Sequence, residues 1–189
     1  MVPRELSGGR HPGRGAAGSR ADRNALAADP PGWVAGYIGL PWRERGRPRA
    51  GWRAARADEE VAGCDCWGLL RLVLAERFGI DVPAYDGRYA DTSDRAELAA
   101  LIRGGTGPWR AIWTSDAGGG VGGTAAAGIQ AGDGVLFRLA GQPCHVGVVV
   151  AKGWMLHVQG GTDSGLERFD GVRWARRLAG FYRWVGETA

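Results

Sequence analysis

The sequence predicts an α+β fold in which N-terminal helices pack on a C-terminal antiparallel sheet. Apolar residues recur at helical spacing in the first half of the chain, in the stretches 33–38, 65–78 and 94–103. From Trp109 onward the pattern changes to short β segments separated by turn residues. Helices that come first and strands that come later favour an α+β arrangement.

The chain divides into an extension and one domain. Residues 1–32 are rich in Arg, Gly, Ala and Pro, end in two prolines and a glycine, and show no apolar period. We therefore expect residues 1–32 to be a disordered extension that folding does not need. The domain is expected to span residues 33–186. It begins with a helical turn that carries Trp33, Tyr37 and Ile38 on one face.

The central helix is predicted to begin near Asp65. Leu69, Leu70, Val73 and Phe78 follow at helical spacing, and a glycine then ends the helix. A second helix is expected from Asp94, with a glutamate three residues later as its capping partner and a pair of glycines at its end. The segment 115–128 consists almost wholly of Gly, Ala and Thr, and is interpreted as a surface insertion.

Six strands are expected in the second half of the chain. They cover Trp109–Trp113, Gly134–Leu139, His145–Val149, Gly153–Gln159, Leu166–Phe169 and Leu178–Trp184.

Composition restricts the class of protein. At 189 residues and 44% hydrophobic content, the chain can form one ordinary core. No run approaches the ~18 apolar residues of a membrane span, and none resembles a secretory signal, so we expect synthesis in the cytoplasm. The net charge is +4 without a clustered basic stripe, which argues against nucleic-acid binding. Three cysteines are an odd number, which favours reduced thiols that are available for chemistry.

A thiol and two imidazoles form the candidate chemistry. Cys66 lies at the start of the central helix, where the field of unpaired backbone N–H groups favours a thiolate. His145 and His157 are twelve residues apart, so a turn centred on Ala151 would place them opposite each other on one face of a hairpin. This set supplies a nucleophile, a base and a group that orients the base. Each residue alone also has an ordinary structural interpretation, as a buried cysteine or a strand histidine.

An ordered set of motifs resembles the NlpC family of papain-like cell-wall cysteine peptidases. The motifs extend over about Trp33 to Trp184, and the last of them resembles the subgroup found in phage tails and gene-transfer agents. In chain order they are Pro41-Trp42 with Gly46, Asp65-Cys66-Trp67-Gly68-Leu69, Gly132-Asp133-Gly134-Val135-Leu136-Phe137, His145-Val146-Gly147-Val148, Met155-Leu156-His157, Leu166-Glu167-Arg168-Phe169 and the run Trp174 to Arg183.

The resemblance implies a papain-like fold and a role for each matching residue. Cys66 would be the nucleophile, His145 the general base and later the acid, and His157 the third, orienting residue. The backbone N–H of Cys66 would contribute to an oxyanion hole, with Asp65 and Trp42 as substrate-binding or oxyanion support. Trp42 stands where relatives often have a tyrosine, so only an indole N–H is available there. The implied reaction is hydrolysis of an amide bond in peptidoglycan stem peptides, without a cofactor or a metal.

The resemblance also implies a place of action. A cell-wall enzyme must reach the periplasm or the outside, so we expect it in the tail or baseplate of a phage-like particle, beside other tail or baseplate proteins. There it would open the wall as genetic material is delivered.

Three other interpretations remain open. A catalytically silent structural tail protein, or an acyl transferase or amidase, could use the same fold. The third interpretation is a zinc-binding module, because five thiol and imidazole side chains could act as ligands. Two observations argue against zinc. The Cys-x-Cys spacing is tighter than in the usual zinc knuckle, and the neighbouring strand residues Cys144 and His145 face opposite ways. Cys64 and Cys144 are expected to be core residues. The five candidate zinc ligands are Cys64, Cys66, Cys144, His145 and His157.

Overall fold

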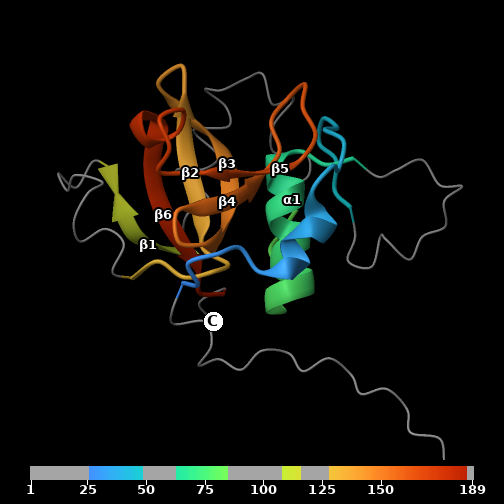
Figure 1. Ribbon diagram of the computed structural model, residues 1–189, viewed down its shortest axis with the longest axis horizontal. Coiled ribbons are helices and arrows are strands. Elements are labelled where there is room, and N and C mark those ends of the chain that lie inside the picture. The colour runs from blue at the N-terminus through green and yellow to red at the C-terminus, as the bar shows by residue number, and fades with distance from the viewer. Residues whose placement is uncertain (1–25, 49–62, 85–107, 116–127, 187–189) are drawn as a thin grey trace, which may run out of the picture.

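The computed structural model describes residues 26–48, 63–84, 108–115 and 128–186. These residues form one antiparallel sheet with a helix packed on one face, so the expected α+β class is confirmed (Figure 1). The elements are the 3-10 helix Gly32–Tyr37, α1 Cys66–Val73, the π-helical turn Leu74–Phe78, β1 Trp109–Thr114, β2 Gly134–Leu139, β3 Gln142–Ala151, β4 Trp154–His157, β5 Gly165–Arg168, the 3-10 helix Ala175–Arg177 and β6 Leu178–Trp184.

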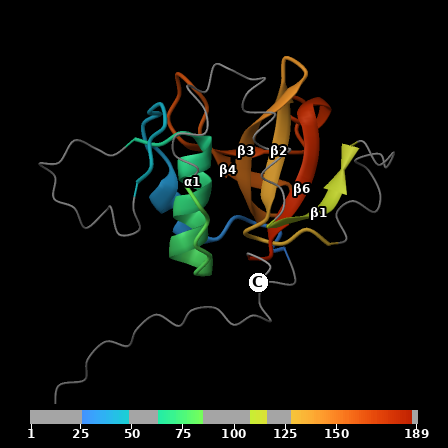
Figure 2. The same ribbon diagram turned by 180° about the vertical axis from the view of Figure 1, so that it is seen from behind.

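The sheet has the strand order β1-β6-β2-β3-β4-β5, and every neighbouring pair is antiparallel. The last strand in the chain, β6, therefore lies between β1 and β2. Strands β2 to β5 follow one another by short connections, as the alternation of apolar segments and turn residues predicts. Figure 2 shows β1 at the edge of the sheet that is farther from α1.

The start of α1 is determined by Asp65. Its side chain accepts a hydrogen bond from the backbone N–H of Gly68 at 2.7 Å, which satisfies one of the unpaired donors of the first turn. Helical structure continues through the π-helical turn to Gly79, whose φ of 64° is a left-handed conformation that favours glycine. Both the predicted start and the predicted end of this helix are confirmed.

The loop 41–47 packs directly against the first turn of α1. Trp42 forms a parallel bridge with Cys64, and the backbone N–H of Cys64 donates to the carbonyl of Pro41 at 3.0 Å. The approach is so close that a Cβ at Gly68 would lie 2.0 Å from the carbonyl oxygen of Gly46. The two glycines allow the loop to hold this end of the helix against the rest of the chain.

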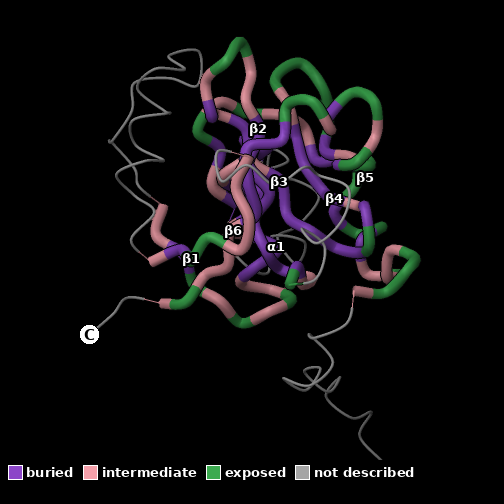
Figure 3. The backbone as a smooth tube through the Cα atoms, turned by 90° about the vertical axis from the view of Figure 1, so that its left-hand side faces the viewer, coloured by how far each residue is buried: buried purple, intermediate pink, exposed green. Residues whose placement is uncertain are grey.

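Two apolar clusters lie on either side of the sheet. The α1 cluster joins Leu69, Leu70 and Val73 to the even-numbered residues Val148 and Leu156 of β3 and β4. The second cluster contains odd-numbered residues of β2, β3 and β4 and a tryptophan from the segment after β5. It includes Val135, Phe137, Val149, Met155 and Trp174. Figure 3 shows the buried backbone concentrated in α1 and the central strands.

Residues just before Trp33 contact the domain. Leu26 packs against the second cluster, and the carbonyl of Ala27 accepts a hydrogen bond from the backbone N–H of Lys152 at 2.9 Å. One leucine and one backbone hydrogen bond therefore connect residues 26 and 27 to the domain, although their composition shows no apolar period. The rest of the predicted extension, residues 1–25, lies outside the described residues.

The first helical turn also differs from its prediction. Tyr37 is fully buried, whereas Ile38 is 50% exposed because the 3-10 helix ends at Tyr37 and the chain becomes extended at Ile38. The hydroxyl of Tyr37 donates to Glu76 at 2.6 Å and accepts from Arg77 at 2.9 Å, which ties this turn to the end of the central helix.

The strands match their predicted positions closely. β2 and β6 have the expected bounds, β3 is longer at both ends, and β4 is shorter. The predicted helix from Asp94 and most of the insertion 115–128 lie outside the described residues. No helix in the described segments is long and apolar enough to cross a membrane.

Candidate active site

Cys66 is the first residue of α1 and is partly exposed. Its sulfur lies near the backbone N–H groups of Trp67, in its own helix, and of Val146, in β3. Because Val146 directly follows His145, the start of α1 and the imidazole-bearing part of β3 meet at one place. The thiol therefore lies beside the strand that carries the first of the two candidate histidines.

The two histidine side chains are in direct contact. Nε2 of His145 lies 3.1 Å from Nδ1 of His157, a hydrogen-bond distance, and the rings meet edge to face. Both side chains are buried, with 3% and 5% of their surface exposed. The hydrogen bond uses Nε2 of His145 and leaves Nδ1 as the ring nitrogen available for another partner.

The register of the hairpin differs from its prediction. Val148 pairs with Leu156, so His157 lies beside Gly147 and diagonal to His145, rather than directly opposite it. A bulge between Val149 and Ala151 and a turn at Lys152 and Gly153 produce this shift. The rings still share a face because the register beyond the bulge pairs residues of equal parity, and Gly147 leaves room for the diagonal contact.

Three residues that sequence reasoning did not select, Glu167, Arg173 and Trp174, extend the contacts of the buried histidine pair toward the surface. Nε2 of His157 lies 3.7 Å from Oε1 of Glu167 in β5. The same carboxylate accepts from Arg173 at 2.8 Å and from the indole N–H of Trp174. Glu167 and Trp174 both belong to the motifs of the closing run, and the alternation of β5 already placed Glu167 on one face with His157.

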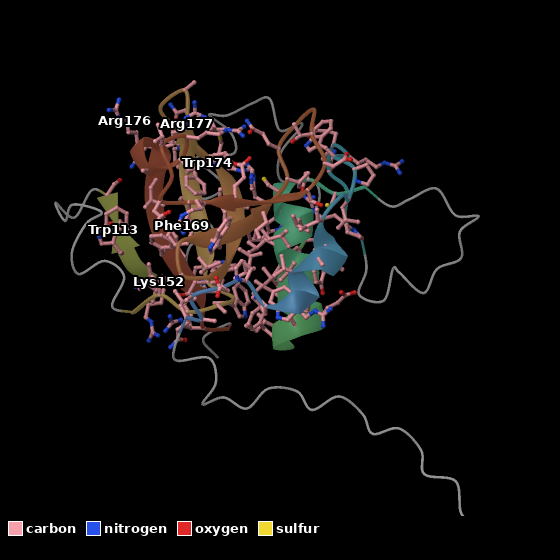
Figure 4. The ribbon with its side chains drawn as sticks, in the orientation of Figure 1. Trp113, Lys152, Phe169, Trp174, Arg176 and Arg177 are labelled. Carbon is pink, nitrogen blue, oxygen red and sulfur yellow. The ribbon has the colours of Figure 1, made fainter. Side chains whose placement is uncertain are left out.

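Trp174 forms the wall behind both histidines. Its ring stacks on His145 with centroids 5.1 Å apart and planes 18° apart, and it meets His157 edge to face. Phe137 packs 4.7 Å from the same indole, between centroids. In Figure 4, Trp174 lies toward the same end of the sheet as Arg176 and Arg177, and Lys152 lies toward the opposite end. Ring contacts on these sides restrict the rotation of both imidazoles.

Burial determines the resting charges of the site. It raises the pKa of the Cys66 thiol to about 12; Asp65 adds to this rise, whereas the N–H groups of Val146 and Trp67 and the Arg47 side chain oppose it. Burial, with smaller effects of His157 and Arg173, lowers the pKa of His145 to about 3. Both shifts favour a neutral thiol and a neutral imidazole over an ion pair. Burial therefore acts against the thiolate that the helix N-terminus is expected to favour.

The remaining predicted residues surround the start of α1. Asp65 is 1% exposed, caps the helix and pairs with Arg47 at 2.5 Å. Trp42 is partly buried and packs near Gly160, in the loop between β4 and β5. Cys64 is fully buried, as expected of a core residue. Cys144 is only partly buried, because alternation along β3 places it on the side of the strand away from His145.

The zinc alternative gains no support from the described part of the chain. Among its residues, no group of three or more His, Cys, Asp and Glu side chains is arranged to hold a metal ion. The close polar set is instead a linear chain of two imidazoles and a carboxylate.

Several solved structures match this chain at low sequence identity. The P60 domain of the antigen MAP1204 from M. avium subspecies paratuberculosis is 16% identical, with a TM-score of 0.46. The match covers 82% of this chain and 90% of that domain's chain. An NlpC/P60 family protein from Bacillus cereus is 16% identical, with a TM-score of 0.46, 81% of this chain covered and 38% of that chain. The NlpC/P60 domain of the peptidoglycan hydrolase SagA is 17% identical, with a TM-score of 0.39, 79% of this chain covered and 90% of that chain. Comparison with curated proteins found no match.

The family is shown by the sequence itself. The family model described as the NlpC/P60 family matches residues 50–183, which is well over half of the chain and includes Cys66, both buried histidines and the carboxylate of β5. With a helix-start cysteine beside a histidine pair on an antiparallel sheet, the chain belongs to the NlpC/P60 family.

Proposed function

We propose that this protein is a cysteine peptidase that hydrolyses amide bonds in peptidoglycan stem peptides. The observation that carries the proposal is the 3.1 Å contact between Nε2 of His145 and Nδ1 of His157, next to a partly exposed thiol at a helix start. Membership of the NlpC/P60 family supports a hydrolase of this kind. The substrate class comes from the family, and one solved relative is described as a peptidoglycan hydrolase.

The resting charges determine how the reaction begins. Because burial favours the neutral forms of Cys66 and His145, in this mechanism the proton moves from Sγ to Nδ1 of His145 as the sulfur attacks the scissile carbonyl. The backbone N–H of Cys66, at the start of α1, then donates to the developing oxyanion. His145 then gives its proton to the leaving amine, and water hydrolyses the thioester with His145 again acting as the base.

The direct test is the release of fragments from purified sacculi, identified by mass spectrometry. We expect the full chain to release stem-peptide fragments and Cys66→Ala to release none while it remains folded. Cys144→Ala is the matched control, because it removes another partly exposed thiol, which lies in β3, and should keep its activity. Absence of fragments with the unaltered chain would favour the catalytically silent alternative. Activity in Cys66→Ala would exclude this thiol as the nucleophile.

We infer that the place of action is the tail or baseplate of a phage-like particle. Support comes from the resemblance of Leu166–Phe169 and of the run Trp174 to Arg183 to the tail-associated subgroup. Purified particles from the producing cell should contain the protein in constant proportion to the tail proteins. Its presence only in the soluble fraction of lysed cells would contradict this assignment.

A further inference from the structure

The series of polar side chains in the site does not end at the third residue, His157. The far nitrogen of His157, Nε2, points to the carboxylate of Glu167 at 3.7 Å, within the range of an ion pair and longer than an ordinary hydrogen bond. Glu167 is 34% exposed and lies on β5, whose residue Gly165 pairs with His157.

Two donors hold this carboxylate in place. Arg173 donates to Oε1 at 2.8 Å and, with its second terminal nitrogen, to the side-chain oxygen of Gln159 at 2.8 Å. The indole N–H of Trp174 donates to Oε2. Trp174 is 1% exposed and stacks on His145, so one side chain fixes both the carboxylate at the end of the series and the imidazole at its start.

The carboxylate determines which nitrogens carry protons. An ionised carboxylate only accepts hydrogen bonds, so the nitrogen that faces it, Nε2 of His157, carries the proton. The Nδ1 of a neutral His157 is then an acceptor, and Nε2 of His145 must donate to it across the 3.1 Å contact. This leaves Nδ1 of His145 with a free electron pair. The opposite order would place a proton on that nitrogen and remove the base.

We propose that Glu167 is a positioning residue that sets the tautomers of His157 and, through it, of His145, so that Nδ1 of His145 is the basic nitrogen. The effect of this role on catalysis rests on the proposed peptidase function. The contacts among Glu167, His157 and His145 do not depend on it. Glu167 does not touch the reacting atoms and acts only through His157.

Arg173 opposes the electrostatic effect of Glu167 on the histidine pair. The Glu167 carboxylate favours a positive charge on His157, whereas the Arg173 guanidinium opposes a positive charge on either histidine. Asp65 and Arg47 pair with each other at the start of α1, and the Arg177 guanidinium lies over the Trp174 ring. Removing Glu167 and removing Arg173 should therefore shift the protonation of the histidine pair in opposite directions.

The first experiment reads the tautomers directly in the full chain. Long-range ¹⁵N–¹H NMR spectra distinguish a protonated from an unprotonated ring nitrogen. We expect protons on Nε2 of both His145 and His157 near neutral pH. In Glu167→Gln, an amide cannot accept from His157, Arg173 and Trp174 together, so the single tautomer should be lost. A proton on Nδ1 of either residue in the unaltered chain would overturn the proposal.

The second experiment uses kinetics on a soluble stem peptide. Glu167→Gln should lower kcat about 10- to 100-fold with little change in KM, as is typical when a group that orients a catalytic histidine is lost. The acid limb of the pH profile should move to lower pH in Glu167→Gln and to higher pH in Arg173→Gln. Asp170→Asn is the matched control: it removes an equally charged carboxylate three residues away that pairs only with exposed Arg168.

The outcomes separate this proposal from the proposed function. Unchanged kcat and tautomers in Glu167→Gln, or equal effects in Asp170→Asn, would overturn the role of Glu167. If the unaltered chain showed the expected tautomers but cleaved neither sacculi nor stem peptides, the proposed peptidase function would fail and the role of Glu167 in setting the tautomers would stand.

Discussion

His145 is buried as a neutral ring, and this makes the stability of the fold depend on pH. The pKa of His145 is about 3 in the folded protein and about 6.5 in an unfolded chain. Between these values the unfolded state binds more protons, so the stabilising effect is fully present above about pH 6.5 and is lost as the pH falls toward 3. Burial lowers the pKa of His157 as well, which acts in the same direction.

We therefore expect the free energy of unfolding to fall below about pH 6.5, with His145 contributing about 1.4 kcal/mol per pH unit. Urea unfolding at about pH 7.5 and about pH 5.5 measures this difference. His145→Gln, which cannot titrate, should show a smaller loss over the same interval. Equal losses in both proteins would mean that His145 is already charged in the folded state.

Gly147 controls the contact between the two histidines. A Cβ at this position would lie 3.1 Å from the sulfur of Met155 and 3.3 Å from Cβ of His157, closer than ordinary packing permits. Gly147→Ala should therefore move His157 away from His145 and lower kcat at least about tenfold, because misplaced catalytic groups lose orientation. Gly165→Ala is the control. Gly165 pairs with His157 from the other side, in β5, and no atom lies within 4 Å of a Cβ added there. Similar activity in the two variants would contradict this role of Gly147.

The residues at the centre of the site could be predicted from the sequence, and those at its end could not. Cys66 follows a capping aspartate, and the even spacing of the histidines places both on one face in any register that pairs residues of equal parity, as β3 and β4 do at Val148 and Leu156. The diagonal register depends on a bulge that no local signal marks. The contacts of Glu167 depend on the segment after β5, which returns Arg173 and Trp174 over the histidines. The resting charges depend on burial, which tertiary packing creates.

At the scale of elements, α1 depends on the loop that precedes it. The helix has only eight residues, too few to be stable alone, so packing must hold it. Its buried face against β3 and β4 was predictable from the apolar period. The bridge from Trp42 to Cys64, and the contact of Gly46 with Gly68, join segments whose proximity is a tertiary property.

Gly68→Ala should separate this loop from the helix. The added Cβ would meet a backbone oxygen at 2.0 Å, which no side-chain rotation can relieve, and we expect a loss of about 1–3 kcal/mol in the free energy of unfolding. Denaturant unfolding measures the loss. Gly32→Ala, where no atom lies within 4 Å of an added Cβ, should leave stability nearly unchanged. Equal stability of Gly68→Ala and the unaltered chain would show that the loop moves without cost.

At the scale of the whole molecule, the site is assembled from both sides of one sheet. The thiol belongs to the layer of α1, whereas His145 and His157 lie with Trp174 and Phe137 of the second cluster. The two sides meet at Val146. The papain-like α+β fold of the family therefore needs both apolar clusters to be complete before nucleophile and base are together. The layers were predictable from the order of helices and strands, but the place where they meet was not.

The position of β5 at the edge of the sheet makes the enzyme sensitive to modest heating. This strand has four residues and pairs on one side only, with β4, in the described sheet order. Short edge elements open at lower free energy than a central sheet, so β5 should detach while β2, β3 and β6 stay paired. Glu167 would leave with it, and the catalytic rate should decline several degrees below the cooperative transition seen by circular dichroism. The decline should reverse on cooling. Coincident loss of rate and secondary structure would show instead that β5 melts with the core, and that the edge of this sheet is no weaker than its centre.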